Sequence, residues 1–199
     1  MSRKSPPTEG RFYGDVDKRV QRTRLALAEA LMTLGPEAGV DALEVGALTA
    51  KAGVGRSTFY KHYADKDDFF ITSFANMVAG FDAQARTRPG YRSMLPAREV
   101  FAHVSEARAF ALSLVSSGQF ARTQGLREEK LRTIAEANLK RLHPRMPVAR
   151  RQELAVILAG GFASLMRWWM EAGLKQSAAH VAGLYEMLAE RVLGAEEKA

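Results

Sequence analysis

Eight consecutive residues, RSTFYKHY at 56–63, concentrate side chains that could bind a nucleic acid, with hydroxyl, phenol, ammonium, imidazole and guanidinium groups. On a helix, Ser57, Tyr60 and Lys61 share one face. From that face they can donate hydrogen bonds to phosphates and to base edges. Arg56 stands at the N-terminal end, where it can contact a guanine edge or a phosphate. The spacing therefore predicts a DNA recognition helix over residues 56–63.

The opposite face of this helix carries the rings of Phe59 and Tyr63, which we expect to anchor it in a protein core. A second short helix is expected just upstream. Between the two helices, Gly53 and Gly55 allow a tight turn with left-handed backbone, which few other residues adopt cheaply. Two short helices around a glycine turn form a helix-turn-helix, expected here at about residues 44–63.

An acidic helix start follows the predicted recognition helix. Asp65 is a good N-cap, and Asp67 and Asp68 suit the positive end of a helix dipole. Lys66 interrupts this acidic turn, where a cation is unfavourable by the dipole alone. An external anion is its expected partner, so the pattern predicts a contact with a DNA phosphate. A plain surface lysine is the alternative.

The run Ala52-Gly53-Val54, the run STFYKHY at 57–63 and Lys66 together resemble the TetR family of bacterial transcription regulators. The resemblance extends over about residues 23–70. The family often has threonine where Leu43-Glu44 stand, so no hydroxyl–phosphate contact is predicted there. It also usually has Ile-Ala where Leu48-Thr49 stand, and that change keeps an apolar residue beside a small one.

The resemblance implies a homodimeric, ligand-responsive regulator, usually a repressor, that binds a near-palindromic operator. Carried over position by position, the residues that would contact double-stranded DNA are Arg56, Ser57, Thr58, Tyr60, Lys61, His62 and Lys66. The same family commonly dimerises through two C-terminal helices per subunit. It usually encloses a pocket for a small-molecule effector in the body of each subunit.

Helix-forming residues dominate and no stretch reads as a strand, which predicts an all-α fold. Glycine and proline breaks divide the chain into about nine helices. We expect a flexible arm over residues 1–15, a DNA-binding domain over 16–66, and a ligand-binding and dimerisation domain over 67–199. The first helix is expected at about residues 17–34.

In the C-terminal part, the segment 154–169 is apolar almost all round and must be covered on two sides. It is expected either as the central core helix of a monomer or as a helix that also contacts a partner subunit. The candidates for a dimer interface are Phe162, Met166, Trp169, Leu184 and Leu188. Large side chains that could line an effector pocket, or form ordinary core instead, are Phe81, Phe101, His103, Phe110 and Trp168.

The chain has 199 residues and a net charge of +7, which is permissive for nucleic acid. The surplus lies in residues 76–150, with thirteen basic and six acidic residues, so global charge does not locate a DNA-binding face. It is compatible with an anionic effector or with a solvated basic surface. The absence of cysteine excludes disulfides, thiolate metal sites and a cysteine nucleophile.

No hydrolase, metalloprotease or phosphate-loop motif is present, and the four histidines lack metal-ligand spacing. We therefore expect no enzyme activity and no cofactor. A nonspecific DNA-binding protein, a protein-interaction module and a motif-less helical-bundle enzyme acting on a small molecule remain as alternatives. The longest uncharged apolar run has thirteen residues, too short to span a bilayer. The N-terminus lacks a signal peptide, so a cytoplasmic protein with no membrane partner is expected.

Overall fold

The structure is a computed structural model that describes the backbone of residues 10–196 and the side chains of residues 18–194. Over this range it contains ten helices and no strand, which confirms the predicted all-α fold with one helix more than expected. The helices are α1 (Gly10–Ala38), α2 (Val45–Lys51), α3 (Arg56–His62), α4 (Lys66–Ala85), α5 (Ala97–Glu106), α6 (Arg108–Ser116), α7 (Gln119–Arg122), α8 (Gln124–Leu142), α9 (Val148–Glu171) and α10 (Ala178–Glu196).

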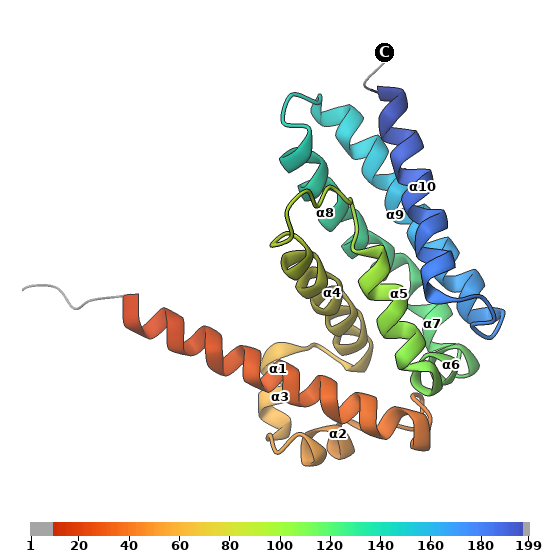
Figure 1. The fold of residues 1–199 in the computed structure, drawn as a ribbon. Coiled ribbons are helices and arrows are strands. Elements are labelled where there is room, and N and C mark those ends of the chain that lie inside the picture. The colour runs from red at the N-terminus through yellow and green to blue at the C-terminus, as the bar shows by residue number, and fades with distance from the viewer. Residues whose placement is uncertain (1–9, 197–199) are drawn as a thin grey trace, which may run out of the picture.

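The first helix is longer than the sequence pattern predicts. It begins at Gly10 and ends at Ala38, so residues 10–15 are helical where a loose arm was expected. The rest of that predicted arm, residues 1–9, lies outside the described residues. The N-terminal half of α1 extends beyond the other helices, while its C-terminal half lies against α2, α3 and the body (Figure 1).

Two hydrophobic cores organise the chain. The N-terminal core joins α1, α2, α3 and the start of α4, and its buried members include Leu27, Leu48, Phe59 and Phe69. Because Phe69 belongs to it, this core reaches past the boundary expected at residue 66. Partly buried side chains from α6 also pack against it, so the N-terminal module and the body are in direct contact.

The larger core holds the body together. It is built where α8 packs along α9 and where α5 packs along α10. Helix α4 leads from the N-terminal module into this body, and the C-terminal end of α10 lies at the end opposite α2 and α3 (Figure 1). The short recognition segment therefore sits at one extremity of an elongated molecule.

Helix α9 is covered on one side only within the subunit. Its core face is fully buried and includes Leu158, Phe162 and Trp169. On the other side Val156 and Ile157 are each 49% exposed.

Among the helices of the described chain, none combines the length and the apolar character needed to cross a membrane.

Candidate nucleic-acid interface

The turn between α2 and α3 is a helix C-terminal motif that requires one glycine. Gly53 has φ of +66°. Its N–H donates to the carbonyl of Ala50 at 3.2 Å, and the N–H of Val54 donates to the carbonyl of Thr49 at 3.0 Å. This pair of bonds is a Schellman motif, in which the left-handed residue is usually glycine. Gly55 has φ of −77° and is the N-cap of α3, so only Gly53 uses the left-handed backbone.

Helix α3 has the division between faces that its sequence predicts. Phe59 is fully buried, and Tyr63, directly after the helix, is 2% exposed. Their ring centroids lie 5.3 Å apart, and Phe69 from α4 lies within 5.5 Å of both. Burial raises the pKa of the Tyr63 phenol above its ordinary value. Phe69 meets both rings edge to face, and this cluster fixes the helix to the module from behind.

The outward face of α3 is accessible. Ser57 and Lys61 are exposed and Tyr60 is 58% exposed, whereas Thr58 and His62 are half-buried at the edges of this face. The Tyr60 ring thus lies in solvent beside the hydroxyl of Ser57 and the ammonium of Lys61, where it can stack or donate a hydrogen bond. The structure thus brings five of the six predicted polar contacts of α3 onto one surface, while their contact with DNA stays a prediction.

Arg56 is also exposed, but its guanidinium leans toward α2. A Cβ atom added to Gly46 would collide with the nitrogens of this side chain. The absence of a side chain at Gly46 therefore leaves the space in which Arg56 crosses between the two helices. From there it can reach a phosphate beside the recognition helix, as the sequence suggests.

The start of α4 is capped as predicted. The Asp65 carboxylate accepts a hydrogen bond from the N–H of Asp68 at 2.8 Å. The Asp68 carboxylate in turn accepts one from the N–H of Ala64 at 2.9 Å. This reciprocal capping satisfies backbone donors at the helix start and fixes the exit of the chain from α3.

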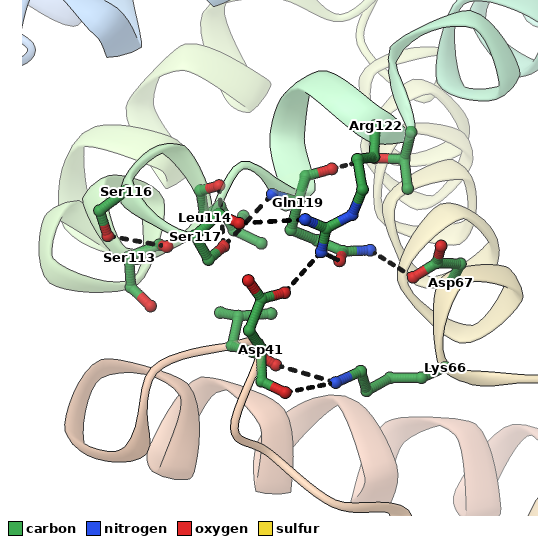
Figure 2. Close-up of polar contacts among 11 residues, drawn as sticks. Asp41, Lys66, Asp67, Ser113, Leu114, Ser116, Ser117, Gln119 and Arg122 are labelled. Carbon is green, nitrogen blue, oxygen red and sulfur yellow. Dashed lines mark hydrogen bonds and ion pairs between the residues drawn. The ribbon is translucent and has the colours of Figure 1, made fainter.

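Lys66 has a different partner from the phosphate that its position suggested. Its ammonium group donates to the backbone carbonyls of Asp41 at 2.8 Å and Val40 at 3.4 Å, in the connection between α1 and α2 (Figure 2). Backbone carbonyls within the subunit therefore take the place of the external anion. In the free protein Lys66 therefore supports the module internally. We propose that it keeps this role in the DNA complex, and the phosphate contact stays the alternative prediction.

A polar cluster beside Lys66 joins the module to the body, and sequence reasoning missed it. Arg122 of α7 pairs with the Asp41 carboxylate at 2.5 Å and donates to the side-chain carbonyl of Gln119 at 2.6 Å. The amide nitrogen of the buried Gln119 donates to Asp67 of α4 at 2.7 Å (Figure 2). Residues so distant in sequence give no local signal for this arrangement.

A close packing contact lies beside the polar cluster. The ring of Phe110 in α6 packs on Gly35 of α1, where an added Cβ atom would lie 2.7 Å from the ring. The Ser113 hydroxyl donates to the Gly35 carbonyl at 3.1 Å. Helix α6 is therefore fixed to the last turns of α1 by both packing and a hydrogen bond.

The five residues predicted for an effector pocket do not meet at a common cavity. Phe101 is fully buried and packs against Phe162 and Trp169, as ordinary core. Phe110 belongs to the contact with the N-terminal module. Phe81 and His103 lie in ring contact with each other at 5.5 Å, and Trp168 is 47% exposed on α9.

The two cavities described below are lined by residues other than these five. A groove of about 650 Å³ lies between the α4–α5 connection, α5 and α10, and is lined by charges of both signs. A much smaller cavity lies among α4, α7, α8 and α9, beside Arg127. Arg127 lies one turn before Leu131 on the buried stripe of α8, and this spacing was the available signal.

The predicted dimer residues divide into two groups. Phe162, Met166 and Trp169 are at most 2% exposed inside the subunit, because they form its core. Leu184 and Leu188 of α10 are exposed and so accessible to a partner subunit, while their place in an interface stays a prediction. The apolar side chains exposed beside them, which sequence reasoning did not select for an interface, are Val156, Ile157, Trp168 and Met187.

Among the residues that the structure describes, no group of three or more acidic or histidine side chains could hold a metal ion. The exposed face of α3 offers hydroxyl groups, an ammonium group and an aromatic ring, which can hydrogen-bond, attract an anion and stack. That combination suits the phosphates and base edges of a duplex.

Comparison with known proteins agrees with this geometry. Residues 27–72 match the family model of "Bacterial regulatory proteins, tetR family". An uncharacterized HTH-type transcriptional regulator, YxbF of Bacillus subtilis (strain 168), is 34% identical over 77 residues, which are 38% of this chain and 20% of that protein. The match thus spans about a fifth of that relative's length.

Two solved structures share the fold over most of the chain. The TetR family repressor AlkX from Dietzia sp. strain DQ12-45-1b, implicated in biodegradation of n-alkanes, has a TM-score of 0.60 at 16% identity, covering 86% of this chain and 95% of AlkX. The dihydroxyacetone kinase operon activator DhaS has a TM-score of 0.57 at 12% identity, covering 86% of this chain and 94% of DhaS.

Proposed function

We propose that this chain is a transcription regulator of the TetR family, whose model matches residues 27–72. We further propose that it binds double-stranded DNA as a homodimer and changes its DNA affinity when a small molecule binds its body. The observation that carries the proposal is the amphipathic character of α3. Its rings are buried in the module, and its polar face is open to solvent at one end of the molecule.

The contacts we propose with DNA come from this open face. Ser57, Tyr60 and Lys61 would enter the major groove, with Arg56 at the start of the helix beside the backbone. Thr58 and His62, at the edges of the face, would contact phosphate or sugar. The exposure of Ser57, Tyr60 and Lys61 in the free protein supports this role, since binding in the groove needs accessible donors on a helix that is anchored on its other face.

A second copy of the chain would cover the exposed apolar side chains of α9 and α10. Val156, Ile157, Trp168, Leu184 and Leu188 are each between 37% and 49% exposed, and the two helices that carry them pack against each other. Two such helix pairs meeting about a two-fold axis would form a four-helix interface. Two-fold symmetry then requires a near-palindromic operator, with half-sites about one helical turn apart or slightly more.

We further propose that the bound protein represses transcription, since occupying a promoter blocks polymerase without any additional contact surface. The fold itself does not fix the direction of control, because the solved structures with this fold include a repressor and an activator. An effector among the body helices would act only through different affinities for the DNA-binding and released states.

Selection of binding sites from random duplexes tests the DNA-binding proposal. We expect the full chain to enrich duplexes that contain an inverted repeat. The Tyr60→Ala and Lys61→Ala variants should each fail to retain these duplexes. Lys130→Ala, which changes an exposed lysine on α8, is the matched control and should bind like the parent. Enrichment without a consensus would indicate a nonspecific binder, and binding unaffected by the two α3 variants would refute the proposed interface.

The dimer is tested by light scattering coupled to size exclusion. Ile157→Glu places a charge in the proposed interface, so we expect a monomer with an intact helical spectrum. Leu25→Glu, at a leucine of α1 that is 62% exposed, should leave the mass unchanged. A parent chain that is monomeric at micromolar concentration, or an Ile157→Glu variant of unchanged mass, would contradict this interface.

A further inference from the structure

We infer that the effector site of the body takes an organic anion, a carboxylate with an apolar body, and that Arg127 of α8 binds its charged group. This inference rests on the proposed function, because it specifies the ligand class of the regulator's effector site. It is carried by a buried cation without a counter-charge next to a cavity with an otherwise mostly apolar lining.

Arg127 is buried but not neutralised. The residue is 8% exposed, and among the described residues no carboxylate forms an ion pair with it. One terminal nitrogen donates to the carbonyl of Phe120, while the Nε atom is buried without a hydrogen-bond partner. A charged donor left unpaired in the interior is expensive unless another molecule completes its bonding.

Two aromatic rings stabilise this cation only in part. The guanidinium carbon lies 3.5 Å from the ring centroid of Phe120 and 5.6 Å from that of Phe74. Ring faces attract a cation but carry no net charge. Burial lowers the pKa of Arg127 to about 10, so the group still carries its proton at neutral pH. The positive charge is therefore permanent under physiological conditions.

The other buried charge of the described chain is treated differently. Asp82, which is 2% exposed, pairs with Arg86 and accepts a hydrogen bond from Asn138 at 2.9 Å. The fold thus supplies a counter-charge for the buried carboxylate, whereas the guanidinium of Arg127 has a carbonyl and two rings but no counter-charge among the described residues. The contrast indicates that the missing partner of Arg127 comes from outside the chain.

The cavity beside Arg127 defines the rest of the ligand. Its lining is mostly apolar and comprises Phe74, Phe120, Gln124, Leu131, Ala163 and Met166. Its volume is about 10 Å³, room for roughly one water molecule. A carboxylate at Arg127 must therefore push the lining side chains apart, and the groups that follow it would contact apolar surface.

Displacing the lining of this cavity would also affect the contacts between the body and the N-terminal module. Phe120 lies on α7 between Gln119 and Arg122, the two residues that bind Asp67 of α4 and Asp41 of the α1–α2 connection. Phe74 lies on α4 itself. A ligand that separates Phe120 from Phe74 would move α7 relative to α4, and with it the cluster that joins the body to the module (Figure 2).

Ligand titration without DNA tests the proposal on the full chain. The probes are acetate, hexanoate, octanoate, decanoate and phenylacetate, with octan-1-ol as the uncharged match of octanoate. We expect at least one carboxylate with an apolar body to raise the melting temperature in a saturable way. Acetate and octan-1-ol should do so much less. If none of the carboxylates raises the melting temperature in a saturable way, or if octan-1-ol raises it as much as octanoate does, the inference is overturned.

The variants separate the anion site from a structural role. Arg127→Met should weaken the binding of the active carboxylate by about 30-fold or more, as expected for a desolvated charge pair. Arg132→Met removes an exposed arginine of the same helix and should bind like the parent. An unchanged affinity in Arg127→Met would overturn the inference. Arg127→Gln keeps hydrogen-bonding capacity, and it should lose the carboxylate response in the same way if Arg127→Met does not fold.

Two further readouts make the outcome specific. Without ligand, Arg127→Met should melt at or above the temperature of the parent, because it removes an unpaired buried charge; a large drop would instead assign Arg127 to structure. Arg127→Met and Arg127→Gln should both still bind the operator selected by the parent chain. If the parent fails to bind DNA, the proposed function fails, whereas the DNA-free titration still decides the ligand class.

Discussion

Gly53 and Gly55 lie two residues apart in the α2–α3 turn, but Gly53 has a positive φ angle and Gly55 a negative one. At Gly53, with φ of +66°, nothing lies within 4 Å of an added Cβ atom, so the cost of a side chain there is backbone strain alone. Gly53→Ser should therefore lower the free energy of unfolding by about 1–2 kcal/mol. The added side chain meets no steric clash that could confuse this value.

The same substitution at Gly55 should act in the other direction. This N-cap has φ of −77° and ψ of 151°, and an added Cβ atom would lie 3.7 Å from the Ser57 hydroxyl, an ordinary contact. A serine there restricts the unfolded chain and can cap α3, so Gly55→Ser should raise stability by up to about 1 kcal/mol. Urea unfolding of the two variants measures both values. Equal destabilisation by both substitutions would refute the assignment of the turn.

Three further predictions concern the module and its connection to the body. Phe59→Ala should cost about 3–5 kcal/mol in urea unfolding because it empties a core position, whereas Tyr60→Ala should change stability by less than about 0.5 kcal/mol; similar costs would mean that the faces of α3 are wrongly assigned. Gln119→Leu removes the bond to Asp67, and thermal unfolding should show a loss of about 0.5–1.5 kcal/mol. A more stable variant would indicate that this bond does not support the fold. Lys66→Met should cost about 1 kcal/mol and leave the salt dependence of DNA binding unchanged. A slope of log K against log salt that is smaller by about 1.8, or two contacts per dimer, would instead support the phosphate contact.

The sequence predicts the recognition helix well because its determinants are local. The positions of Phe59, Tyr60 and Lys61 relative to the core follow from the helical period over a single short helix. The capping residue Asp65 and the glycine turn depend on neighbours a few positions away. Such features need no knowledge of the rest of the fold, and the structure contains each of them.

Features that depend on contacts between distant segments were not predictable in the same way. Phe162 and Trp169 belong to an apolar helix, but only the packing of α5, α8 and α10 against it decides which side is buried. Lys66 finds carbonyl groups about 25 residues earlier in the chain, in a connection without a sequence signature. Arg127 lies in a highly charged segment, where its burial is visible only from the stripe that it shares with Leu131.

The contact between α1 and α6 makes positions 35 and 110 dependent on each other during evolution. A methyl group at Gly35 would occupy space that the Phe110 ring now fills, so any larger residue there requires a smaller one opposite. In related sequences the volumes at these two sites should covary inversely. Gly35→Ala alone should displace α6, and adding Phe110→Leu should restore the fit. Covariation at this pair would then show how related chains adjust the packing of the N-terminal module against the body.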